Sequence, residues 1–230
     1  MSDLIATPLL WLAVTLVVFE AADILSRRSG RHPLCHPVLL ATPVLIGVLL
    51  TTKTPYATYA EATQVLGFLL GPAVVGLAVP IWAQRATIRR LAKPLACALL
   101  AGAVTAIVSA VGIVWLFGAS VEIMASIAPR ATTTPVGMAV ASQLGGIPAL
   151  AAVIVLMSGV FGAMTATPLL NLLKIRDWRA RGFAVGVSAH GFGAARAFQV
   201  DQTAGAFASL GMALNAVATA TILSIVASLI

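Results

Sequence analysis

The chain has 230 residues, of which 60% are hydrophobic and only 9% are charged. A soluble domain carries about 25% charged residues, so this composition excludes a soluble globular protein and indicates a helical protein that crosses a membrane several times. The net charge of +7 comes from basic residues in short loops between apolar runs, a pattern typical of membrane topology and not of nucleic-acid binding.

Apolar segments follow one another along the chain, separated by short polar stretches. They cover residues 4–26, 37–52, 62–84, 94–118, 120–146, 147–173, 182–200 and 204–230. The first has no basic residue ahead of it and carries Glu20 and Asp23 near its end, so we expect a membrane helix and not a cleaved signal peptide. An ion pair with Arg27 or Arg28 is the simplest role for these two acids, and a functional role is the alternative.

Two of the earlier segments contain residues that interrupt a helix. Segment 62–84 holds several glycines and prolines, and we expect a helix to restart at Pro72, since proline suits the first helical position. Segment 120–146 is also interrupted, because a polar run from Pro129 to Pro135 lies between its two apolar halves. There we expect Thr134 to cap a new half-helix that begins at Pro135.

The stretch from Gly182 to Asp201 is the most unusual in the chain, because it places polar groups and glycines inside an apolar run. Gly191 and Gly193 each weaken a helix by about 1 kcal/mol relative to alanine, so the sequence predicts unwinding next to His190. Irregular backbone at membrane depth is tolerated only where protein or a wet cavity surrounds it. Such broken segments are where transporters bind their cargo.

Basic residues predict the topology. Loops 27–36, 85–93 and 174–181 carry three, four and four Lys or Arg, whereas loop 53–61 carries one. With the three basic loops in the cytoplasm, segment 120–146 must start and finish on the outer side as a re-entrant hairpin. Segment 182–200 is then expected to run outward and 204–230 inward, with Arg196 toward the outer side.

This order predicts two units of opposite orientation in one integral membrane domain spanning 1–230. The expected inverted repeats are 37–118 and 147–230, with the re-entrant hairpin 120–146 between them. A shift of 115 residues sets 67–84 over 182–199 with five identities in eighteen positions, three of them glycine. Together these features predict an all-α protein with the inverted-repeat architecture and broken helices of a secondary transporter.

Distinctive motifs follow one another between residues 132 and 210. They are Thr132-Thr133-Thr134-Pro135, the run from Gln143 to Pro148, Gly159-Val160-Phe161-Gly162, Arg181-Gly182 with His190 and Gly193, and the run from Ala206 to Leu210. These motifs resemble those of the LrgB/CidB membrane protein family. The resemblance implies a multi-pass protein of the bacterial inner (cytoplasmic) membrane, often working with a small LrgA/CidA-type membrane protein. The family is described as antiholin-like, modulating murein hydrolase export. It also includes the plastid glycolate/glycerate transporter, whose C-terminal part this chain resembles, and bacterial relatives connected with small hydroxycarboxylates.

The chain departs from the family pattern in polar positions. Arg130-Ala131-Thr132 stands where the family commonly has Lys-Ser-Val, and Ala189 stands where it commonly has serine before the motif histidine. Gly193-Ala194-Ala195-Arg196 replaces Gly-Thr-Ala-Lys. The lost hydroxyls leave the substrate open, and arginine can hold a carboxylate through two parallel hydrogen bonds where lysine cannot.

A small organic anion needs a cationic or dipolar group for its carboxylate, and the predicted substrate-binding residues lie at the two helix breaks or face them. They are Thr132, Thr133, Thr134, Pro135, Ser188, His190, Gly191, Gly193, Arg196 and Asn215. The free N–H groups at a half-helix N-terminus suit such an anion.

Each of these polar residues also has a structural alternative. The threonines can cap a helix, and His190 can satisfy backbone groups at the break instead of contacting substrate or carrying a proton. Arg196 can reach the outer surface, Asn215 can join helices, and Arg130 can pair with Glu122 instead of binding a ligand.

The sequence holds no catalytic constellation, metal-ligand cluster or nucleotide motif, so we expect no enzyme, no cofactor and no metal. The leading hypothesis is a secondary transporter of glycolate- or glycerate-like hydroxycarboxylates that works by alternating access of the elevator type. The alternative is a holin- or antiholin-like regulator of murein hydrolase export and cell lysis. Expected partners are the organic anion, a co-transported proton or sodium ion, the LrgA/CidA-type protein, the lipid bilayer and a second copy in a homodimer, with no nucleic acid.

Overall fold

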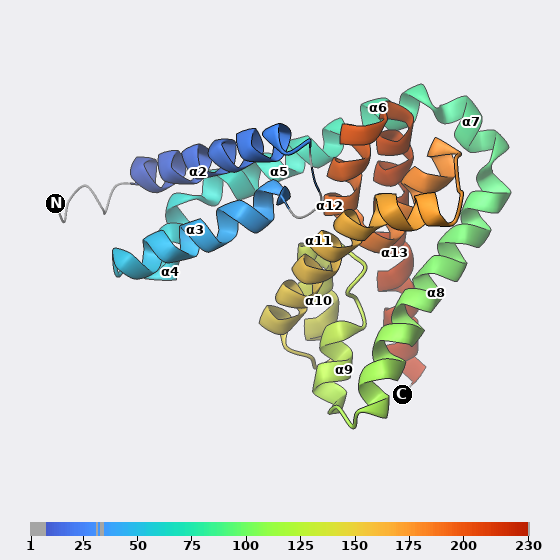
Figure 1. The fold of residues 1–230 in the computed structure, drawn as a ribbon. Helices are drawn as coiled ribbons and strands as arrows, with labels where there is room; N and C mark the ends of the chain where they lie inside the picture. The colour runs from blue at the N-terminus through green and yellow to red at the C-terminus, as the bar shows by residue number, and fades with distance from the viewer. Residues whose placement is uncertain (1–7, 31, 33–34, 230) are drawn as a thin grey trace. The chain divides into compact units, whose positions relative to one another are not determined.

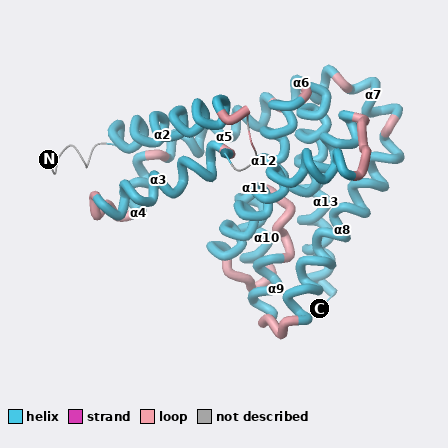
Figure 2. The backbone as a smooth tube through the Cα atoms, viewed as in Figure 1, coloured by secondary structure: helices cyan, strands magenta, loops and turns pink. Residues whose placement is uncertain are grey.

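The computed structural model describes residues 8–30, 32 and 35–229, and the regular structure in this part of the chain is helical throughout (Figure 2). Five helical stretches of the described part are long and apolar enough to cross a membrane: Pro8–Arg28, Gln64–Ala83, Ala92–Leu116, Pro148–Leu172 and Gln202–Ser228. The prediction of a polytopic helical membrane protein is confirmed. Residues 4–7 of the first predicted segment and residue 230 of the last lie outside the described residues.

The chain forms two compact units, which divide after Gly76. Unit 1 contains α2 (Pro8–Arg28), α3 (Pro37–Thr51), α4 (Tyr56–Ala62) and α5 (Gln64–Gly76), and α2 packs against both α3 and α4. The hydroxyls of Thr15 and Tyr59 lie 3.0 Å apart. At the end of α2, Arg27 pairs with Glu20 at 2.7 Å and with Asp23 at 3.1 Å, as the sequence predicts.

Unit 2 contains the remaining helices, coloured from cyan-green to red in Figure 1. They are α6 (Ala78–Ala83), α7 (Arg85–Arg90), α8 (Ala92–Leu116), α9 (Val121–Ile127), α10 (Thr134–Gln143), α11 (Pro148–Leu172), α12 (Trp178–Val200) and α13 (Gln202–Leu229).

Two predicted boundaries differ from the structure. The helix does not restart at Pro72, which lies inside α5; the interruption falls at Leu77, between α5 and α6. Pro80 explains this position, because it has no N–H to donate to the carbonyl of Gly76 one turn earlier. The basic stretch that the sequence predicts as a loop from Arg85 is largely the short helix α7.

The long helices α8 and α13 run in the same direction. Leu95 and Leu99 of α8 pack near Phe207 of α13, and farther along both helices Ile107 and Val111 pack in the same cluster as Leu223. Helix α11 runs the opposite way beside α12, since Gly162 contacts Ala189 while Asn171, near the end of α11, contacts Arg181 near the start of α12.

Helices α9 and α10 form a helical hairpin, which we call hairpin A (residues 121–143). Beyond the end of α9 the chain turns at Pro129 and α10 then returns. Its far end reaches α9 again, because the N–H of Ile147 donates to the Ser126 hydroxyl at 2.8 Å and Gly146 lies close to the backbone of Ser126. The chain beyond α10 thus returns to α9, whereas the re-entrant course of 120–146 in a membrane stays a prediction.

Helix α12 also turns back on itself, which the sequence does not predict. His190 has φ 39° and ψ −129°, far from helical values. Beyond it, Gly193 lies against the carbonyl of Val185, and Arg196 lines the same crevice as Trp178 at the start of the helix. Half-helices 178–189 and 191–200 are thus antiparallel, and we call this structure hairpin B (residues 178–200).

The first half of hairpin B runs parallel to α13 and touches it backbone to backbone. Gly182 lies against Ala204, and one turn later Gly186 lies against Ala208. A side chain at either glycine would collide with an α13 carbonyl, so only glycine permits this approach.

Hairpin B corrects the predicted course of the chain. Segment 182–200 does not cross outward, and Arg196 does not lie toward the outer side; it returns to the end of unit 2 at which α12 begins. Helix α13 then leads away from that end instead of toward it. A break can be predicted from glycine content, but the direction after the break is set by the His190 dihedrals and the contacts with α13. The single domain 1–230 and the inverted repeats 37–118 and 147–230 stay predictions.

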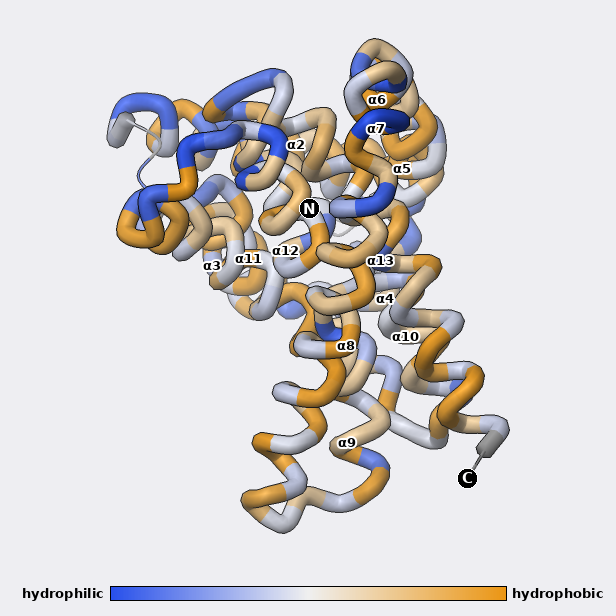
Figure 3. Tube along the Cα trace, turned by 90° about the vertical axis from the view of Figure 1, so that its right-hand side faces the viewer, coloured by the Kyte–Doolittle hydropathy of each residue, from blue (hydrophilic) through white to orange (hydrophobic). Residues whose placement is uncertain are grey.

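The basic stretches 85–93 and 174–181 lie at the same end of unit 2. Leu91 and Pro94 share the lining of one cavity with Asp177 and Arg179. Figure 3 shows hydrophilic residues gathered at α7, whereas α8 is mainly apolar along its length. We call this the basic end; it is the end that the positive-inside rule assigns to the cytoplasm.

Candidate functional site

The tip of hairpin A is a tight turn followed by a helix N-terminus. The hydroxyl of the buried Thr132 donates to the carbonyl of Pro129 at 2.7 Å, so Thr132 closes the turn. Thr133, not Thr134, is the N-cap of α10, and its carbonyl accepts the Gly137 N–H at 2.8 Å. Pro135 still lies in the first turn, where a missing N–H costs nothing. These positions do not test the prediction that Thr132, Thr133, Thr134 and Pro135 contact a substrate.

The tip of hairpin B is held by His190. Its imidazole is only 3% exposed, and Nε2 donates to the carbonyl of Val155 in α11 at 3.0 Å. Gly159 makes room for the ring, and Phe192 packs against it edge-on with ring centres 5.8 Å apart. The structure therefore gives His190 the backbone-satisfying role that the sequence leaves open as an alternative.

Asn215 joins the two tips from the middle of α13. Its side chain is fully buried, and Nδ2 donates to the carbonyl of Ala131 in hairpin A at 2.9 Å and to that of Val187 in hairpin B at 3.1 Å. In an unbroken helix the Val187 carbonyl would accept the N–H of residue 191, so the break frees it. Thr219 donates to Asn215 Oδ1 at 3.3 Å, which fixes the amide orientation.

Beside these joined tips lies the guanidinium of Arg130, half-buried between α8 and α11. Nη1 donates to the Ser158 hydroxyl at 3.3 Å and Nη2 to the Ser109 hydroxyl at 3.5 Å. Both distances are at the long end of the hydrogen-bond range. The expected pair with Glu122 is not among the ion pairs of residues 8–30, 32 and 35–229. An anion would be a stronger acceptor than either serine.

Two cavities reach Arg130. One, of about 670 Å³, extends from Leu91 and Asp177 at the basic end to Ser109 and Arg130. The other, of about 650 Å³, follows α11 and also ends at Arg130. Ser188, on the exposed face of half-helix 178–189, lines both cavities, and its hydroxyl donates to the Ala184 carbonyl at 2.8 Å.

An ion pair lies at the mouth of the first cavity. Arg179 contacts both carboxylate oxygens of Asp177, with the shortest distance 2.7 Å, and both residues line the cavity. The side-chain hydrogen bond from Arg179 lowers the pKa of Asp177, and the same bond raises the pKa of Arg179. Because the pair is exposed, it adds little stability.

The predicted site residues thus separate into groups. Ser188 lies on the cavity walls, whereas Thr132, His190 and Asn215 are buried in structural hydrogen bonds. Gly193 packs against Val185 within hairpin B. Gly191 is exposed, and Arg196 lies at the basic end, where Nη1 donates to Gln199 at 3.2 Å.

Comparison with known proteins identifies the family of this chain. The model of the LrgB-like family matches residues 15–229. The chain belongs to the LrgB-like family. It is 28% identical over 216 residues to the holin-like protein CidB of Staphylococcus epidermidis, covering 94% of each chain. It is 30% identical over 208 residues to the uncharacterized protein YwbG of Bacillus subtilis, covering 90% of this chain and 92% of the relative. No solved structure shows a significant match.

In this LrgB-like protein, sequence reasoning misses Ser109 and Ser158 and does not include Arg130 in the predicted site. A signal was present for all three, because polar side chains inside apolar segments are costly and tend to face one another or a cavity. Their meeting could not be foreseen, since Arg130 is 21 residues from Ser109 and 28 from Ser158.

Proposed function

We propose that this LrgB-like protein is a secondary transporter of small organic anions of the glycolate and glycerate type. The observation that carries the proposal is Arg130, an arginine at the meeting point of two cavities that is held only by two distant serine hydroxyls among the described residues. A carboxylate placed there would form short charge-assisted hydrogen bonds. The substrate hydroxyl would form hydrogen bonds with the hydroxyls of Ser109, Ser158 and Ser188.

The two hairpins support a mechanism of alternating access. They enter unit 2 from opposite ends, and their tips meet at Asn215, beside the arginine. Irregular backbone at such a midpoint is how secondary transporters form a site that each side can reach in turn. In this proposal unit 2 carries the anion and moves as one body, as in an elevator. Coupling to a proton or sodium ion, a homodimer, an LrgA/CidA-type partner and the bacterial inner membrane belong to the same proposal.

The test is uptake by purified protein in liposomes, with labelled glycolate, glycerate and lactate as probes. Replacing Arg130 with glutamine removes at least one hydrogen bond to a charged group, which contributes about 1.5–3 kcal/mol, so the apparent affinity should fall at least about 10- to 100-fold. Arg130→Lys keeps the charge and should fall less. Arg90→Gln, an exposed change in α7, is the matched control. Equal uptake by the Arg130→Gln variant and the wild type would refute the site.

A second function is favoured by the name of a relative. The holin-like protein CidB of Staphylococcus epidermidis matches nearly the whole chain. We therefore keep the alternative hypothesis, a holin- or antiholin-like regulator of murein hydrolase export and cell lysis. Liposomes filled with a fluorescent dye larger than glycerate separate the two functions. A carrier retains the dye while it accumulates labelled acid. Dye release without acid accumulation would instead support the holin-like function.

A further inference from the structure

A second cationic site lies at the basic end of unit 2, inside the crevice that hairpin B forms with α11. Arg181 is 9% exposed, and its Nη1 donates to Asn171 Oδ1 at 2.8 Å and to the Ile175 carbonyl at 3.1 Å. Its guanidinium carbon stands 4.8 Å from the ring centre of Trp178, a cation–π arrangement. The side chain is therefore fixed in position before any ligand arrives.

Part of this guanidinium forms no hydrogen bond with the described residues. Within residues 8–30, 32 and 35–229, the hydrogen bonds of Arg181 all use Nη1, and no carboxylate forms an ion pair with it. Arginine has five N–H donors, so those on Nε and Nη2 remain for another acceptor. A buried charge without a counter-charge is costly, which favours an anion as that acceptor.

The crevice brings a second arginine to the first. Arg181 and Trp178 come from the outgoing half of hairpin B, Arg196 and Val200 from the returning half, and no acidic residue lines it. Its volume is about 20 Å³, enough for about one water-sized group. A whole organic anion does not fit, but one oxygen of a phosphate group does, with the rest of its molecule outside.

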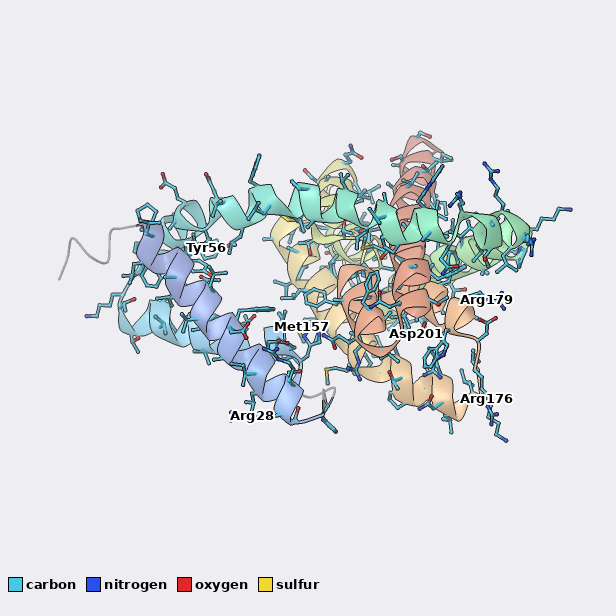
Figure 4. All side chains as sticks on the ribbon, turned by 90° about the horizontal axis from the view of Figure 1, so that it is seen from above. Arg28, Tyr56, Met157, Arg176, Arg179 and Asp201 are labelled. Atoms are coloured by element: carbon cyan, nitrogen blue, oxygen red, sulfur yellow. The ribbon has the colours of Figure 1, made fainter. Side chains whose placement is uncertain are left out.

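We propose that this crevice binds the phosphate group of an anionic ligand at the membrane surface, with two arginines as its donors. The surroundings suit a lipid headgroup. Arg85 stacks over Trp82 at 5.0 Å, a second arginine–tryptophan pair. Figure 4, which looks onto this end of unit 2, shows Arg176 and Arg179 toward its rim and Asp201 nearer its centre. Tryptophan and basic residues are typical of the layer of lipid headgroups, and basic crevices between helices bind acidic ones.

The experiment measures lipid retention by the full chain. Protein purified in phosphatidylcholine is mixed with phosphatidylglycerol or cardiolipin, and bound lipid is counted by native mass spectrometry. The wild type should retain the acidic lipids about tenfold over phosphatidylcholine, because the choline cation of phosphatidylcholine offsets the charge of its phosphate beside the two arginines. Arg196→Gln and Arg181→Lys should remove most of this preference. Arg176→Gln, which changes an exposed arginine in the loop before α12, should keep it.

Arg181→Lys keeps the charge near Asn171, and Arg196→Gln leaves the Asn171 contact intact, so loss of folding does not obscure the result.

Inorganic phosphate, added in phosphatidylcholine alone, identifies the source of the ligand. If it raises the melting temperature in wild type but not in Arg196→Gln, and competes with acidic lipid, the crevice binds phosphate from either source. Equal lipid retention by wild type and both crevice variants, without a phosphate effect, would overturn the proposal. Liposome uptake at Arg130 is a separate measurement and can fail independently.

Discussion

Asn215 is the residue on which the two hairpin tips depend. One amide donates to carbonyls from residues 84 and 28 positions away. Ala131 lies in the turn of hairpin A, and Val187 lies in the last turn of half-helix 178–189, where the break removes its helical donor. A buried carbonyl without a donor costs about 1–3 kcal/mol, so the polar group of Asn215 is needed for stability before any role in transport.

Asn215→Leu is expected to lower the free energy of unfolding by about 2–6 kcal/mol, because two buried carbonyls lose their donor at once. Thr219→Val is the matched control: it removes only the 3.3 Å bond to Asn215 Oδ1 and keeps a similar volume, so a loss of about 1 kcal/mol is expected. Thermal unfolding of the two variants in detergent provides the comparison. If both lose the same stability, the tips do not depend on Asn215.

His190 adopts a backbone conformation that side chains rarely occupy, with φ 39°. Such a residue costs about 1–3 kcal/mol and persists only where its surroundings compensate. Here the Val155 bond compensates.

His190→Gly should therefore destabilise less than His190→Ala, by about 1 kcal/mol or more, since glycine removes the strain while both variants lose the hydrogen bond. Melting temperatures of the two variants measure the difference. The opposite order would show that His190 is not strained in the membrane. Because His190 does not line either cavity, His190→Gly should also keep anion uptake, in contrast to a substrate-binding role.

At the scale of elements, hairpin B is a helix pair packed on α13 through residues without side chains. The contact of Gly186 with the Ala208 carbonyl leaves no space for a methyl group. Close packing of this kind is how helices associate in a membrane, where no hydrophobic driving force acts between them.

Gly186→Ala should separate half-helix 178–189 from α13 and reduce stability by about 1–3 kcal/mol, the usual cost of overpacking. Gly191→Ala provides the control in the same helix, since a methyl group there meets only the Met212 sulfur at 3.8 Å. It should be neutral or stabilising by up to about 1 kcal/mol. Folded yield and melting temperature report both. Equal tolerance of the two alanines would contradict the packing described.

The elements themselves could be predicted to a large extent. Apolar length gives the long helices, and the Pro129–Pro135 run gives the turn of hairpin A. Hairpin B could not be predicted as a hairpin, because its glycines indicate a weak helix and not the direction in which the chain continues. The candidate site was only partly predictable for a related reason. Ser188 was among the predicted residues, but the meeting of Arg130 with Ser109 and Ser158 depends on how α8, hairpin A and α11 are placed.

At the scale of the molecule, unit 2 has a basic end and an opposite end, and each hairpin enters from a different one. Arg176 and Gln199 are expected at the basic end, whereas Phe117 at the end of α8 and Ser228 at the end of α13 are expected at the other. If residues 182–200 crossed the membrane once, Gln199 would lie at the end opposite the basic end and Ser228 would lie at the basic end.

Single cysteines at these four positions, in a background with Cys35 and Cys97 replaced by serine, test the arrangement with an impermeant maleimide. Arg176→Cys and Gln199→Cys should react only from the cytoplasmic side, and Phe117→Cys and Ser228→Cys only from the outer side. Reaction of Gln199→Cys from the outer side would show that α12 crosses the membrane and that hairpin B is wrong.

The contact between hairpin B and α13 also has a consequence for biosynthesis. Helix α12 is not among the stretches apolar enough to span a membrane, and the surfaces that cover its glycines, at Ala204 and Ala208, are translated after it. The insertion machinery therefore meets α11 and α13 as successive spans, while residues 178–200 can pack only on α8 and α11 until α13 has left the ribosome. Assembly of unit 2 must then finish after translation, with hairpin B folding into a space between helices that are already inserted.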